Sequence, residues 1–97
     1  MLDKMKELFE MKRQADQIKK ELDALVIEYT DVRGIKVVIN GSQDIKSLEI
    51  DDSLVNPANK KRLENDLTRG LNGAVKKSQF AAAQRMKKLM PGGFPGM

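Results

Sequence analysis

Apolar residues in the first quarter of the chain recur at steps of three and four. The positions that follow this spacing are Leu8, Met11, Ala15, Ile18, Leu22 and Leu25. They form a narrow stripe of heptad type along one side of a helix, with charged residues beside it. Residues 2–25 contain no Gly or Pro. The pattern therefore predicts one amphipathic helix about 36 Å long, at 1.5 Å per residue.

The spacing then changes to that of β-strands. Residues 26–30 are rich in β-formers, residues 35–39 alternate, and a third apolar run follows at 45–50. Asn40-Gly41 separates the last two runs, and Gly41 is expected to supply the positive φ of a hairpin turn. The pattern predicts a three-stranded antiparallel meander. Strict alternation places Ile45 and Leu48 on opposite faces, so both faces carry apolar residues and one helix can cover only one of them well.

A second long helix is expected after the third strand. Asn56 is the predicted N-cap, with Pro57 at the first helical position, and no other Pro occurs before residue 91. Its apolar side consists of Leu63, Leu67, Leu71, Ala74, Ser78, Ala82 and Leu89. Gly70 and Gly73 each weaken the helix by up to about 1 kcal/mol. They indicate either a kink or a place where another backbone approaches closely.

The domain organisation follows from these elements. We expect one α+β domain over residues 1–90 and a flexible Gly/Pro/Met tail over residues 91–97. Two long helices overhang any sheet of three short strands, and their apolar stripes need partners. A homodimer is the simplest solution, and a loosely packed monomer is the alternative.

The composition argues against an enzyme. The chain has no His and no Cys, which removes the commonest general base, the thiolate nucleophile and the best transition-metal ligands. It also has no Gly-rich phosphate loop motif. We therefore predict no catalytic residue, metal, cofactor or small-molecule substrate, and interpret Asp51 and Asp52 as turn residues. No apolar run approaches the roughly 20 residues of a membrane span, and the charged N-terminus is unlike a secretory signal, so a cytoplasmic location is expected.

Positive charge is concentrated in the last third of the chain. Residues 57–97 carry nine basic and two acidic side chains, whereas the whole chain has a net charge of +4. Helical placement puts a line of basic residues opposite the apolar side of the second helix, consisting of Arg62, Arg69, Lys76 and Lys87. Because no acidic residue follows Asp66 in this helix, we expect the positive charge of this line to be uncancelled. The corresponding line on the first helix is Lys6, Arg13 and Lys20, which Glu10 and Asp16 partly cancel.

Such a helix attracts a polyanion or an anionic surface. Binding of a nucleic-acid backbone explains the absence of acids from residues 69–88 better than a solvated face does, and an anionic membrane or an acidic protein is a third interpretation. Arg85 falls on the apolar side. Phe80 lies on the basic line, where it could pack against a second subunit or touch a sugar or base.

Four segments carry a resemblance to a known family. They read MLDKMKELFEMKRQADQIKKEL, IKVVINGSQDIKSLEIDDSLV, LTRGLNGAVKKSQ and MPGGFPGM. In these segments, and in the order of its elements, the chain resembles the YbaB/EbfC family of small bacterial nucleoid-associated proteins. The strand, Asn-Gly turn, strand and Ile-Asp-x-Ser-Leu pattern over residues 35–54 is the most specific part.

The resemblance implies a homodimer whose sheets associate and whose helices project like the arms of tweezers. It also implies binding of double-stranded DNA, a location at the cytoplasmic nucleoid, and a role in nucleoid organisation or gene regulation. The DNA-binding positions expected from the resemblance, with Arg62 added from the helical placement, are Lys12, Arg13, Lys19, Lys20, Arg62, Arg69, Lys76, Lys77, Arg85, Lys87 and Lys88. One rival is a protein-interaction module, in which the stripe of the first helix pairs with a foreign helix. Membrane-surface association of the second helix is the other.

Overall fold

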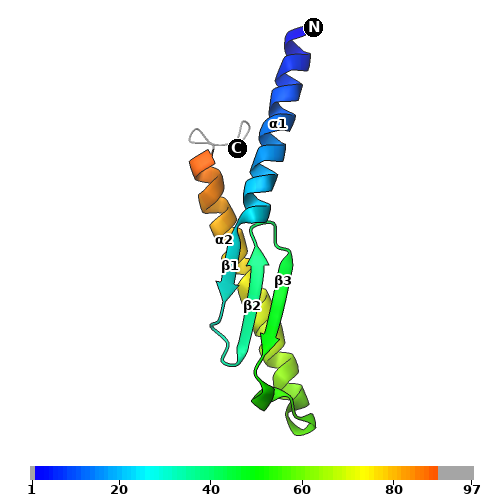
Figure 1. Ribbon diagram of the computed structural model, residues 1–97, viewed down its shortest axis with the longest axis vertical. Coiled ribbons are helices and arrows are strands. Elements are labelled where there is room, and N and C mark those ends of the chain that lie inside the picture. The colour runs from blue at the N-terminus through cyan, green and yellow to red at the C-terminus, as the bar shows by residue number, and fades with distance from the viewer. Residues whose placement is uncertain (1, 90–97) are drawn as a thin grey trace.

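The molecule is an elongated α+β protein with an extent of 67 × 18 × 18 Å. The computed structural model describes residues 2–89, so the tail expected at residues 91–97 lies outside the described residues. Its elements are α1 (Leu2–Ala24), β1 (Val26–Tyr29), β2 (Ile35–Asn40), β3 (Ile45–Ile50), two short 3₁₀ turns (Asp52–Leu54 and Pro57–Asn59) and α2 (Lys60–Leu89). This order, visible in Figure 1, confirms the predicted fold class of long helix, three-stranded antiparallel meander and long helix.

One face of the sheet is covered by α2. The strands lie in the order β1-β2-β3, and α2 packs on β1 and β2. The alternating residues Ile35, Val37 and Ile39 of β2 are buried beneath this helix together with Ala74. Alternation thus places every second side chain of the central strand in the core, as the period of two predicts.

The edge strand β3 keeps part of its apolar surface exposed. Leu48 pairs with Val37 and therefore faces the α2 side of the sheet, yet it is 42% exposed. A register shift between Val38 and Ile39 sets Ile45 opposite Ile39, and Ile45 is 46% exposed. The prediction that Ile45 and Leu48 lie on opposite faces is wrong, because this irregularity interrupts the alternation. We call Ile45 and Leu48 the β3 apolar strip.

Most of α1 projects away from the rest of the molecule (Figure 1). Residues 3–17 are exposed on every side, and we call them the arm. The predicted stripe is covered only at its C-terminal end, where Ile18, Leu22 and Leu25 are half-buried, whereas Leu8 is 66% exposed. A lone helix of this length is marginally stable in water. The arm therefore has an apolar side without a partner inside the described chain.

The turn between β2 and β3 holds the base of α1. The Gly41 N–H donates to the Leu22 carbonyl at 2.8 Å, and the buried Asn40 side chain accepts from the backbone N–H groups of Ser42 and Asp44, each at 2.9 Å. Gly41 does not have the predicted positive φ, and among the described residues Gln43 has it, at 63°, with Gly34. Glycine is needed at position 41 for another reason, since an added Cβ would lie 2.8 Å from the Leu22 carbonyl oxygen.

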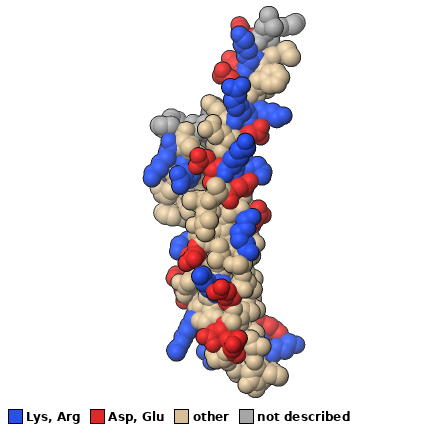
Figure 2. Space-filling view, viewed as in Figure 1, with Lys and Arg blue, Asp and Glu red and all other residues tan. Residues whose placement is uncertain are grey.

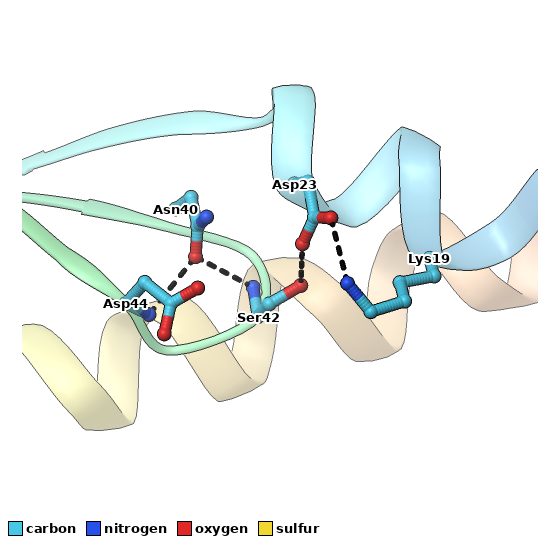
Figure 3. A network of polar contacts seen from close by, with 5 residues as sticks. All are labelled: Lys19, Asp23, Asn40, Ser42 and Asp44. Carbon is cyan, nitrogen blue, oxygen red and sulfur yellow. Dashed lines mark hydrogen bonds and ion pairs between the residues drawn. The ribbon is translucent and has the colours of Figure 1, made fainter.

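Side chains extend this contact between the end of α1 and the β2–β3 turn, which we call the joint (Figure 3). The Ser42 hydroxyl donates to one carboxylate oxygen of Asp23 at 2.5 Å, and the Lys19 ammonium donates to the other at 3.1 Å. The hydrogen bond from Ser42, followed by the one from Lys19, lowers the pKa of Asp23 below its ordinary value. The last turn of α1 is thus tied to the hairpin by both backbone and side-chain hydrogen bonds.

Substituting Gly41 with Ala should lower the free energy of unfolding by about 1–3 kcal/mol, because the new methyl group overlaps backbone that cannot move without breaking the joint. Urea unfolding measures the change. Gly70→Ala is the matched control, since its Cβ would meet only side chains, the nearest being Ile35 at 3.3 Å with Val32 and Val37 at 4.0 Å, and alanine favours the helix. A Gly41→Ala protein as stable as the wild type would show that the approach of Gly41 to Leu22 is not constraining.

The second helix starts slightly later than predicted and runs without a break. Asn56 is the N-cap, accepting from the Ala58 N–H at 3.0 Å, but the first turn is 3₁₀ and the α-helix begins at Lys60. The helix continues through Gly70 and Gly73. At Gly73, the side chain of Tyr29 occupies the space that a Cβ would need. These glycines admit side chains of the sheet, and their nearest neighbours outside the helix are side chains rather than another backbone.

Candidate nucleic-acid interface

The fold brings the basic parts of the two helices to the same end of the molecule. The last residue of α2, Leu89, lines a hollow of about 180 Å³ together with Gln14, Gln17 and Ile18 of α1. The C-terminal turn of α2, with Lys87 and Lys88, is therefore level with the middle of α1. Nothing in the spacing of either helix alone indicates this proximity, which results from the way both helices pack on the hairpin.

The basic line of α2 is partly neutralised at its N-terminal end. Asp66 forms one ion pair with Arg62 at 3.7 Å and a second with Arg69 at 3.5 Å. Its side chain is only 15% exposed, so the carboxylate is held between the two guanidinium groups. The expectation that this line is uncancelled is therefore wrong for Arg62 and Arg69, because i,i+3 and i,i+4 neighbours meet on a helix surface.

Two further candidates are engaged within the protein, and a third is half-buried. The Lys77 ammonium donates to the Glu28 carbonyl of β1 at 2.7 Å, and Lys19 pairs with Asp23 in the joint. Arg85 is half-buried, as its predicted place on the apolar side requires. These side chains are less available to an external ligand than the sequence suggested.

The remaining six candidates are exposed, and within residues 2–89 they make no ion pair and no side-chain hydrogen bond. They are Lys12, Arg13, Lys20, Lys76, Lys87 and Lys88. We call them the free basic set. Three lie on α1 and three on the part of α2 that follows Arg69, which contains no acid.

Figure 2 shows how the charges are distributed on one face of the molecule. Basic side chains gather over α1 and beside the end of α2, with acidic side chains interspersed along α1. The arm is therefore a surface of mixed charge, whereas the second half of α2 carries only positive charge. This contrast agrees with the partial cancellation predicted for the first helix.

One prominent residue of this surface was not singled out from the sequence. Phe9 is 71% exposed and lines a hollow of about 600 Å³ along α1 with Lys12, Arg13, Asp16, Gln17 and Lys20. At 100° per residue it lies within about 40° of Arg13 and Lys20 and about 150° from the centre of the apolar stripe. The helical placement that identified Phe80, which is 67% exposed, would have found it.

A metal-binding cluster and a membrane-spanning helix are both absent from the described residues. Among residues 2–89, no three His, Cys, Asp or Glu side chains are grouped so that they could hold a metal ion. Neither helix, over its described length, is long and apolar enough to cross a membrane.

Comparisons with known proteins point to one family. The model of the YbaB/EbfC DNA-binding family matches residues 1–94. A nucleoid-associated protein of Chloroflexus aurantiacus is 34% identical over 89 residues, which cover 91% of this chain and 88% of that protein. An uncharacterized protein of Mycoplasma pneumoniae is 34% identical over 91 residues, covering 89% and 91%. The crystal structure of an uncharacterized Helicobacter pylori protein has the same fold, with a TM-score of 0.62 at 24% identity over 88% of this chain and 95% of that one.

Proposed function

Because this chain belongs to the YbaB/EbfC DNA-binding family, we propose that it binds duplex DNA as a homodimer, mainly through phosphate contacts and without catalysis. Its place is the nucleoid in the cytoplasm, where it organises DNA or regulates genes. The observation that carries the proposal is the free basic set, which provides six exposed cations on α1 and the second half of α2 that make no ion pair and no side-chain hydrogen bond within residues 2–89.

Phosphate binding suits the chemistry of this surface. Lys and Arg side chains that neutralise phosphates release condensed counterions from DNA, and this release supplies most of the sequence-independent affinity. The cations of the free basic set lie on exposed faces of two helices, and those on the second half of α2 have no acidic residue beside them on that helix. A surface of this kind positions a protein on the DNA backbone without itself specifying a sequence.

The dimer is supported by apolar surface that the single chain leaves uncovered. The β3 apolar strip lies beyond the cover of α2, and β3 is an edge strand with an unpaired side. At the opposite edge, the Lys77 ammonium donates a hydrogen bond to the Glu28 carbonyl of β1. An edge strand with exposed apolar residues favours pairing with another chain, and a two-fold axis through β3 would use the same patch on both subunits.

A mobility-shift assay on a random-sequence duplex tests the proposal. The protein should retard the duplex at about 50 mM salt and release it progressively as the salt concentration rises, since counterion release makes phosphate binding salt-dependent. Absence of binding at low salt, or affinity that does not change with salt, would contradict phosphate-driven binding.

A second candidate function is favoured by one observation, the exposed half of the α1 stripe. Leu8 and Met11 are 66% and 59% exposed and could pack against a foreign helix. That function expects the isolated protein to be a monomer, so light scattering on the pure protein distinguishes it from the DNA-binding homodimer.

A further inference from the structure

The arm has the dimensions of a helix that enters a DNA groove. Residues 3–17 are exposed on every side and extend for about 22 Å at 1.5 Å per residue. A helix with its side chains is about 10–12 Å across, and the major groove of B-DNA is about 12 Å wide. The minor groove is about half as wide and does not admit a helix without deformation.

Phe9 is a large apolar residue of the arm that a second helix packed on the stripe would not cover, and Met5, which is 59% exposed, lies within about 40° of it. Leu8 and Met11 lie on the stripe, whereas Phe9 lies about 150° away around the helix. A large aromatic ring that is 71% exposed on a charged face leaves apolar surface in water. A ligand that fits this face therefore combines apolar groups with negative charge.

The side chains around Phe9 identify such a ligand. Lys12, Arg13 and Lys20 line the same hollow, and Asp16 is its one acidic residue, so the surroundings of the ring are net positive. In the major groove, an apolar group is presented by thymine, whose C5-methyl lies between the two phosphate strands. The long stems of Lys and Arg let their charged ends reach sideways from an apolar contact.

We propose that the Phe9 ring contacts thymine methyl groups in the major groove, while Lys12, Arg13 and Lys20 contact the phosphates on either side. This inference rests on the proposed DNA-binding function and adds to it a preference for A·T base pairs. Phe9 is then a specificity-determining residue on a surface that otherwise binds without regard to sequence.

Replacing thymine with deoxyuridine removes the methyl group and leaves the phosphate charge and base pairing unchanged. We expect the wild-type protein to bind an A·T-rich duplex of about 20 base pairs, two helical turns, at least about fourfold more tightly than its deoxyuridine counterpart. A factor of about four corresponds to one methyl group withdrawn from water. Fluorescence anisotropy with labelled duplexes, at one salt concentration, measures the ratio.

Phe9→Ala should bind both duplexes equally, whereas Phe9→Leu should keep part of the preference because it retains an apolar contact. Alanine is a better helix former than phenylalanine, so the arm is not weakened. Val55→Ala is the control, since Val55 is 64% exposed and lies between the two 3₁₀ turns, outside the free basic set. It should leave the ratio between the duplexes at the wild-type value.

Several outcomes would overturn the inference. One is equal binding of the two duplexes by the wild type; another is an unchanged ratio in Phe9→Ala. Loss of the preference in Phe80→Ala would assign the contact to α2, and dissociation of the Phe9→Ala dimer in light scattering would make Phe9 a dimer-packing residue. Salt-sensitive binding without a thymine preference refutes only this inference, whereas failure to bind either duplex at low salt refutes the proposed function itself.

Discussion

Replacing Lys76 and Lys87 together with glutamate should lower the affinity for duplex DNA by about 100-fold or more. In a homodimer the two substitutions remove four phosphate contacts, and a charge-assisted contact contributes about 1 kcal/mol or more. Both side chains are exposed, so the fold and the dimer should persist. Arg69 is not chosen, because Asp66 already neutralises it in part. Mobility shift measures the affinity and circular dichroism checks the fold.

Lys60→Glu with Lys61→Glu is the matched control for this experiment. It changes the net charge by the same amount, but at the opposite end of α2, where both lysines lie close to Glu64, at 3.9 and 4.0 Å. We expect less than about a tenfold loss of affinity, since distant exposed charges are screened. Equal losses from the two pairs would mean that total charge, and not the free basic set, determines binding. If the protein with Lys76 and Lys87 replaced by glutamate kept its full affinity for DNA, the phosphate contacts would lie on α1.

Substitution of Leu48 with Lys should convert the proposed homodimer to monomers, raising the dimer dissociation constant by about 100-fold or more. The substitution places an ammonium group in the β3 apolar strip, where burial without a partner costs several kcal/mol. Because Leu48 is 42% exposed in the single chain, the protomer itself should remain folded. Light scattering over a range of protein concentrations reports the dissociation, and DNA affinity should fall with it.

Val26→Lys is the comparison for Leu48→Lys, and it tests which edge of the sheet forms the dimer interface, here called the seam. Val26 is 72% exposed on β1, at the other edge of the sheet, so the same charge is introduced at another exposed apolar position. The dimer should survive this change. Dissociation by Val26→Lys, combined with a stable Leu48→Lys dimer, would assign the seam to β1 and contradict the role given to the β3 apolar strip.

The regular elements of this protein were predictable because each is encoded by local periodicity. The steps of three and four before Leu25 and the alternation through Ile35, Val37 and Ile39 are strong signals of helix and strand. The reason for glycine at position 41 was not predictable, because it depends on contact with Leu22, a residue distant in sequence. Local turn chemistry explains a positive φ but not a close approach between two segments.

The basic residues of the candidate site could be predicted from the sequence. Which of them are paired within the protein could not. Sequence spacing placed Lys76 and Lys87 outward and Arg85 inward, and the structure agrees. The sequence spacing did not reveal that Asp66 forms ion pairs with two arginines, or that Lys77 donates a hydrogen bond to the carbonyl of Glu28. Both depend on side-chain conformation and on packing between elements.

The slope of log affinity against log salt concentration, compared between the wild type and a Lys76→Gln, Lys87→Gln protein, tests the central claim most directly. Each phosphate contact contributes about −0.9 to the slope on B-DNA. Loss of four contacts from a homodimer should therefore make the slope shallower by about 3 to 4. Identical slopes for the two proteins, or a wild-type slope near zero, would contradict binding through phosphate contacts made by the free basic set.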